Sequence, residues 1–135
     1  MNFVSFDLAK KLKEKGFSCQ CPIAMYNERG DFHVLYSSVG IENYYDYDNF
    51  DEHDCVCPTI SHVLKWLREE KKIWICVNPV ESGFETTIYD SVKQYYNGEY
   101  GGWMYYNNLV TTLHFGLNYE DSVIDGIKYV LDNLI

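Results

Sequence analysis

The sequence is poor in basic residues and contains no long apolar run. Lys and Arg together number 11 against 20 Asp and Glu, so the 135-residue chain has a formal charge of −9. We do not expect such a chain to bind duplex nucleic acid, because neutralising phosphates requires a basic face. No apolar stretch approaches the roughly 20 residues that a membrane-spanning helix needs, so we also expect no membrane contact.

Linker-like and targeting segments are also missing. The chain has only 3 prolines and 9 glycines, and no Pro/Gly/Ser-rich stretch divides it. Residues Met1 to Phe6 lack the basic start and the following apolar run of a targeting signal. A hydrophobic content of 47% excludes general disorder. We predict a single domain over residues 1–135, located in the cytoplasm.

Two helices are predicted in the first half of the chain. The first runs from Phe6 to Lys15, with Ser5 as the amino-terminal cap and Gly16 at its end. The second lies between Pro58 and Lys72 and begins after a Thr59 cap. Its apolar residues recur at the spacing of one buried helix face: Ile60, Val63, Leu64 and Leu67.

A third helix is predicted from Tyr119 to Asn133. Asn118 is its expected cap, and two acidic residues follow near the positive end of the helix dipole. Gly126 weakens the helix slightly, but it permits close packing against another element.

The segments between these helices are predicted as strands: Cys21 to Tyr26, Phe32 to Tyr36, Ile73 to Val77, Gly83 to Tyr89, Trp103 to Tyr106 and Thr111 to Phe115. The first two form a hairpin around residues 27–30. The apolar run Ile73 to Val77 is typical of a central strand, and we expect Asn78 and Pro79 to end it. Short connections favour an α+β fold: three helices with an antiparallel sheet of about four to six strands, in the order α-β-β-α-β-β-(β)-β-α.

Three helix-forming stretches carry a resemblance. Residues Cys57 to Ile73, Tyr119 to Leu131 and Phe6 to Phe17 together cover about a third of the chain. They resemble stretches in small proteins of phages and integrated mobile elements in Bacteroidetes-type bacteria, a family without an assigned activity. The resemblance therefore implies an origin and leaves the function open.

Two C-x-C pairs are the candidate metal ligands. Cys19 and Cys21 form one pair, and Cys55 and Cys57 form the other, with His53 just before it. Thiolate and imidazole ligands suit Zn²⁺, and four of these five residues would complete a tetrahedral site. Zinc loops usually have two to four intervening residues, whereas one intervening residue turns the two thiols to opposite faces of a strand. We therefore favour free, packed thiols and expect no metal or other cofactor.

The stretch from Glu42 to Asp54 is strongly acidic, and no Lys or Arg occurs from Gly30 to Leu64. It does not match a calcium-binding EF-hand, because Phe50 stands at the fifth position counted from Asp46. We interpret it as a solvated loop. An alternative is an acidic mimic of DNA that inhibits a host nucleic-acid enzyme. That alternative requires exposed carboxylates at phosphate-like spacing, for which the candidates are Asp46, Asp48, Asp51 and Asp54.

An aromatic segment from Tyr95 to Tyr106 is the candidate binding surface. Its members are Tyr95, Tyr96, Tyr100, Trp103, Tyr105 and Tyr106. Tyr and Trp rings bury large areas at low entropic cost while their polar ends stay hydrated. Stacking on nucleic-acid bases would use the same rings, but the segment contains Glu99 and no Lys or Arg. A protein partner or self-association suits it better, and the alternative is that the rings cover a sheet face.

Catalytic signals are weak. The four histidines are His33, His53, His62 and His114, and none stands in a nucleophile-elbow, metalloprotease or phosphate-loop pattern. Lysines gather on the first two predicted helices, which leaves a local nucleic-acid contact open. We predict no catalytic residues and a small binding protein that uses its Tyr/Trp-rich surface. A Cys/His metal protein or enzyme is the remaining alternative.

Overall fold

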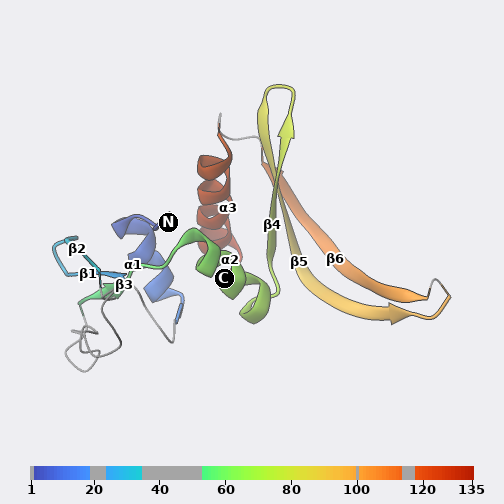
Figure 1. The fold of residues 1–135 in the computed structure, drawn as a ribbon, viewed down its shortest axis with the longest axis horizontal. Helices are drawn as coiled ribbons and strands as arrows, with labels where there is room; N and C mark the ends of the chain where they lie inside the picture. The colour runs from blue at the N-terminus through green and yellow to red at the C-terminus, as the bar shows by residue number, and fades with distance from the viewer. Residues whose placement is uncertain (1, 19–23, 35–52, 100, 114–117) are drawn as a thin grey trace. The chain divides into compact units, whose positions relative to one another are not determined.

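The computed structural model contains helices and antiparallel strands in the order α-β-β-β-α-β-β-β-α (Figure 1). The structure describes residues 2–18, 24–34, 53–99, 101–113 and 118–135, without the side chains of 91–97 and 102–107. The predicted α+β class is confirmed, but the strands form two three-stranded sheets instead of one. The chain divides into two compact units, Met1–Val63 and Leu64–Ile135.

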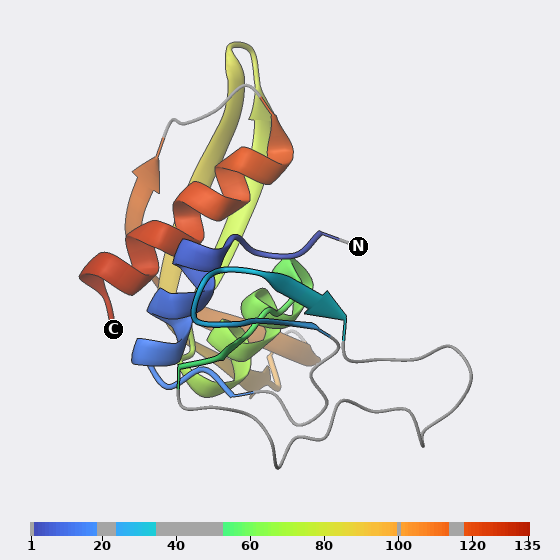
Figure 2. The same cartoon turned by 90° about the vertical axis from the view of Figure 1, so that its left-hand side faces the viewer.

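The first unit holds a short sheet and a helix. Its sheet has the order β2-β1-β3 and consists of β1 (Ala24–Tyr26), β2 (Phe32–Val34) and β3 (Cys55–Val56) (Figure 2). The predicted hairpin is confirmed, because β1 pairs with β2 in antiparallel register. Asn27 closes its loop, since its side-chain oxygen accepts hydrogen bonds from the backbone N–H of Arg29 and of Asp31, both at 2.9 Å.

The helix α1 (Phe6–Glu14) begins at the predicted residue and ends one residue before the predicted Lys15. The Ser5 hydroxyl accepts a hydrogen bond from the Leu8 N–H at 3.3 Å, as an amino-terminal cap should. Gly16 follows the helix with φ 85°, a left-handed conformation that favours glycine.

The amino-terminal residues pair with the segment that leads into α2 (Ile60–Glu70). Val4 donates its N–H to the Pro58 carbonyl at 3.0 Å, and Ile60 donates to the Asn2 carbonyl at 2.9 Å. The Thr59 hydroxyl accepts from the His62 N–H at 3.2 Å, which confirms the predicted cap.

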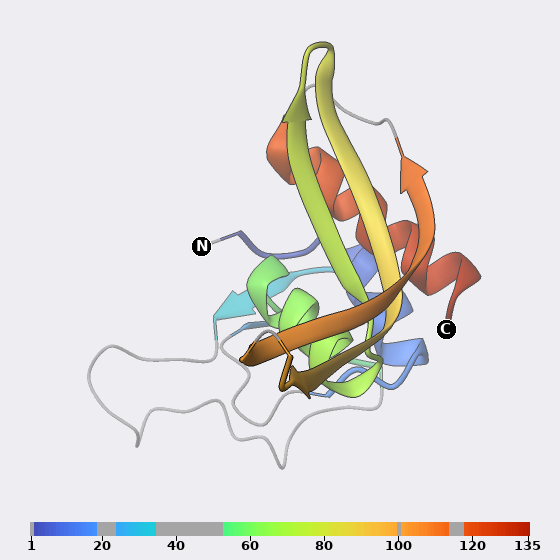
Figure 3. The ribbon, with the colours of Figure 1, turned by 90° about the vertical axis from the view of Figure 1, so that its right-hand side faces the viewer.

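The second unit holds a longer sheet covered on one face by a helix. The strands β4 (Trp74–Val80), β5 (Gly83–Asn97) and β6 (Gly102–Leu113) lie in that order. Helix α3 (Tyr119–Asn133) packs against β4 and β5, as Figures 1 and 3 show. Its limits match the predicted helix, and the Asn118 side chain caps it by accepting from the Asp121 N–H at 2.8 Å.

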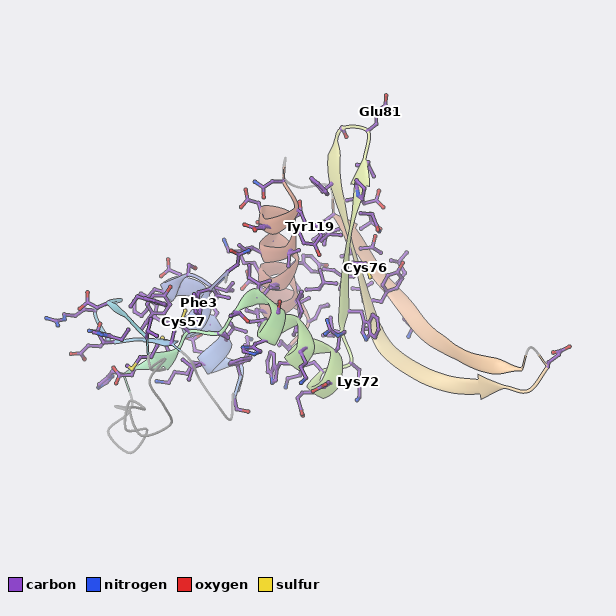
Figure 4. All side chains as sticks on the ribbon, viewed as in Figure 1. Phe3, Cys57, Lys72, Cys76, Glu81 and Tyr119 are labelled. Atoms are coloured by element: carbon purple, nitrogen blue, oxygen red, sulfur yellow. The ribbon has the colours of Figure 1, made fainter. Side chains whose placement is uncertain are left out.

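Strand β4 corrects two expectations. It is an edge strand rather than a central one, and it continues through Asn78 and Pro79 to Val80. An edge strand tolerates proline because the missing N–H can face away from the neighbouring strand. The turn that follows carries Glu81 at its tip (Figure 4).

The contact between α3 and the sheet is close and partly polar. The Thr86 hydroxyl donates to the Ser122 carbonyl at 3.1 Å, and both residues are fully buried. A β-carbon added at Gly126 would lie only 2.9 Å from Cγ2 of Ile75 and 3.0 Å from Cγ2 of Thr86. The close packing predicted for Gly126 is therefore confirmed.

Each unit has its own set of buried apolar side chains. In the first unit they include Val4, Leu8, Ala9, Leu12, Ala24, Met25, Cys55, Cys57 and Val63. In the second unit they include Trp66, Leu67, Ile73, Ile88, Val123, Ile127, Val130 and Leu131.

Candidate functional site

The predicted aromatic segment lies on a two-stranded extension of the second sheet. Strand β4 begins at Trp74, which pairs with Tyr89 of β5. Among the described residues, the part of β5 that follows Tyr89 pairs with β6 alone. We call Asp90–Asn97 of β5 and Gly102–Asn108 of β6 the arm. Figures 1 and 3 show the arm continuing past α3 and β4.

The sequence predicted separate strands at Trp103–Tyr106 and Thr111–Phe115, whereas the structure has the single strand β6. The β5–β6 register shifts once between Ile88 and Tyr89 and again between Asp90 and Lys93. Such bulges bend a strand and strengthen its twist. They also interrupt the alternation of apolar and polar residues, which is why the sequence pattern underestimates the length of both strands.

The register assigns the aromatic residues to the two faces of the arm. Tyr96 lies opposite Trp103, and Tyr105 lies opposite Gln94. Successive residues of a strand lie on opposite faces, so these four positions share one face, which we call the Trp103 face. The other face, which we call the Tyr106 face, holds Lys93, Tyr95, Met104 and Tyr106. Tyr100 lies outside the described residues.

The arm carries little charge. Between Asp90 and Asn108 the charged residues are Asp90, Lys93 and Glu99. A nucleic-acid surface would need several cations beside its stacking rings. The arm therefore has the composition of a protein-contact surface: aromatic, nearly neutral, and with three asparagines.

A second aromatic group lies in the first unit and was missed by the sequence analysis. The ring centre of Phe32 is 5.2 Å from that of Phe3 and 5.7 Å from that of Tyr26, and Tyr26 is 5.4 Å from Phe6. Phe32 is partly exposed on the edge strand β2. No local pattern joins Phe3 to Phe32, because the contact depends on the folded path of the chain.

The thiols of the second C-x-C pair are packed into the first unit. Cys55 and Cys57 are both buried. The Val4 carbonyl accepts hydrogen bonds from the Tyr26 hydroxyl at 2.7 Å and the Cys57 thiol at 3.4 Å. Burial raises the pKa of each thiol, which favours the protonated form that neither attacks electrophiles nor binds metal well.

The described residues include no group of three or more His, Cys, Asp or Glu side chains placed to hold a metal ion. Of the candidate ligands, His53 is exposed, and Cys19 and Cys21 lie outside the described residues. The zinc site, which would use four of these five residues, stays the untested alternative to free, packed thiols.

Tyr26→Phe is expected to lower stability by about 1 kcal/mol, because it removes the hydrogen bond to the Val4 carbonyl. Burial, with Cys57 nearby, raises the pKa of Tyr26 from 10.0 to about 12. Because the pKa of Tyr26 is higher in the folded than in the unfolded chain, the protonated hydroxyl stabilises the fold at pH values below 10.0. This contribution is lost as the pH rises from 10.0 toward 12. Urea unfolding at pH 8 and above pH 10 measures the difference in the free energy of unfolding between wild type and variant, and this difference should be smaller at the higher pH. A difference that does not change with pH would contradict the raised pKa of Tyr26.

The acidic candidates fall mostly outside the described residues. This applies to Asp46, Asp48 and Asp51. Asp54 is only 8% exposed, and its carbonyl accepts a hydrogen bond from the Lys13 ammonium at 2.7 Å. Asp54 is therefore not available to an exposed array of carboxylates, and the DNA-mimic hypothesis rests on the other three residues.

Two basic residues at the carboxyl end of α2 lie over aromatic rings. The Arg68 guanidinium is 5.9 Å from the ring centre of Trp74, and the Lys71 ammonium is 5.4 Å from that of Trp66. Cation–π contacts of this kind stabilise a surface helix locally. These contacts account for the positions of Arg68 and Lys71 without any nucleic-acid ligand.

Among the described residues, no helix is both long and apolar enough to cross a membrane. Comparison of the chain with protein-family models, curated proteins and solved structures finds no match.

Proposed function

We propose that this chain is a small binding protein of phage or mobile-element origin that acts in the cytoplasm and contacts a protein partner through the Trp103 face of the arm. The observation that carries the proposal is the register that puts Tyr96 opposite Trp103, with Tyr105 two residues along on the same face. Trp and Tyr dominate the binding energy of protein interfaces.

The position of the arm supports the same proposal. A two-stranded ribbon is only marginally stable by itself, and this one extends beyond the strand and helix that cover the base of the sheet. Aromatic residues on such a ribbon gain stability when a partner covers them. The near-neutral charge of the arm also means that a partner can cover it without burying unpaired carboxylates.

The test compares two double variants that remove aromatic rings from opposite faces of the arm. In Trp103→Ala/Tyr105→Ala the binding of partners captured from host cells should fall at least thirtyfold, about 2 kcal/mol or more. The matched variant Tyr95→Ala/Tyr106→Ala alters the Tyr106 face and should change binding much less. Affinity is measured with the purified captured partner by titration calorimetry.

Circular dichroism must first show that both variants keep the wild-type spectrum. If the Trp103→Ala/Tyr105→Ala protein is folded and binds as tightly as wild type, the arm is not the contact surface. If both variants lose binding equally, the choice of the Trp103 face is wrong.

A further inference from the structure

The second sheet has two edges, and they differ in how well they are protected against pairing with another strand. The edges are β4 and β6, because the strand order is β4-β5-β6. Edge strands expose backbone N–H and C=O groups that can pair with a further strand. Natural proteins block such edges with charged residues, proline, bulges or short strand length.

The β4 edge carries one of these blocks. Strand β4 spans Trp74–Val80 and contains Pro79, which has no N–H to donate. A strand approaching this edge would meet an interrupted row of donors.

The β6 edge carries almost none of them. The strand Gly102–Leu113 contains no Asp, Glu, Lys, Arg or Pro, although the chain as a whole has a formal charge of −9. The register shift opposite Ile88 and Tyr89 inserts Val110 into β6, whereas the extra residue of the second shift, between Asp90 and Lys93, belongs to β5. Strand β6 therefore has no inserted residue from Gly102 to Leu109. Leu109 is 61% exposed at the end of that stretch. In the part of the chain that the structure describes, no strand pairs with this edge.

We infer that β6 pairs in antiparallel fashion with β6 of a second copy of this chain. The net negative charge makes two copies repel each other, so a contact between copies is most favourable on a surface without carboxylates. Strand β6 is such a surface. Strand β6 has no charged side chain that could form an ion pair with a charged foreign peptide. A second copy of β6 is also uncharged and has the same length, so the two strands can pair along their whole length.

The asymmetry of the two edges also determines the kind of assembly. Pairing β6 with β6 about a two-fold axis uses the same surface twice and closes as a dimer. Pairing β6 with β4 of the next copy would leave edges open at both ends and continue into a filament, and Pro79 disfavours that contact. The dimer forms through the backbone of β6 and does not depend on the aromatic contact proposed above.

The first measurement is the mass of the wild-type protein by light scattering over micromolar to millimolar concentrations. We expect twice the 15.9 kDa of one chain at high concentration. Leu109→Lys places a charge on the open strand and should weaken the dimer at least tenfold. Val34→Lys is the matched control, because Val34 is 63% exposed on the edge strand β2 of the other sheet. It should leave the dimer unchanged.

A second measurement separates edge pairing from other modes of association. In an antiparallel edge strand alternate N–H groups point outward, so a monomer should protect only every second amide of β6 from hydrogen exchange. The dimer should protect consecutive amides from Gly102 to Leu109. The inference is wrong if the wild-type protein is a monomer, or if a dimer keeps the alternating pattern of amide protection. It is also wrong if Val34→Lys breaks the dimer and Leu109→Lys does not.

Discussion

Gly126→Val is expected to destabilise the protein by about 1–3 kcal/mol, the range typical of extra atoms forced into a packed core. The first added carbon would already lie 2.9 Å from Cγ2 of Ile75 and 3.0 Å from Cγ2 of Thr86, and valine adds two methyl groups to that carbon. Helix α3 would have to move away from β4 and β5. The loss should appear as a lower midpoint of urea unfolding with an unchanged slope.

The control for this substitution is Lys128→Val, two residues further along the same helix at an exposed position. It introduces the same β-branched side chain without a packing conflict and should change stability by no more than about 0.7 kcal/mol, the spread of helix propensity. Equal stability of Gly126→Val and wild type would mean that α3 does not rest on Ile75 and Thr86.

Ile88→Ala is expected to cost about 3 kcal/mol, as is typical for truncating a fully buried aliphatic side chain. Ile88 lies opposite Ile75 in the sheet and two residues beyond Thr86, so it shares the face that α3 covers. It is also the last residue before the register shift that leads into the arm. Its truncation removes apolar contacts at the base of the arm.

Two readouts test the Ile88→Ala prediction. Urea unfolding gives the loss of stability, and hydrogen exchange should show faster opening of β5 and β6 before global unfolding. Val80→Ala, on an exposed part of β4, should change stability by less than about 0.5 kcal/mol. A small effect of Ile88→Ala would contradict the role of this residue in holding the arm to the sheet.

The helices could be predicted from the sequence because their signals are local. Ser5, Thr59 and Asn118 each cap a helix through a bond to a backbone N–H three residues away. The hairpin loop at Asn27 is equally local. Such bonds depend on neighbouring residues alone, so the pattern of side chains is enough to place them.

The strands were predicted less completely because their partners are distant in the sequence. The apolar run in β4 looks like a central strand, yet it lies at an edge. Strand β3 (Cys55–Val56) has only 2 residues and leaves no recognisable pattern. The bulges between β5 and β6 concealed the continuity of both strands, since they interrupt the two-residue alternation.

The amino-acid sequence by itself determined the α+β class, the helix limits and the aromatic, uncharged composition of the segment around Trp103. Only the tertiary structure decided that this segment forms an arm, that Tyr96 and Tyr105 share a face with Trp103, and that β6 is an open edge. Composition and capping are properties of adjacent residues. Register and edge position arise when strands far apart in the chain form hydrogen bonds, and no local pattern contains that information.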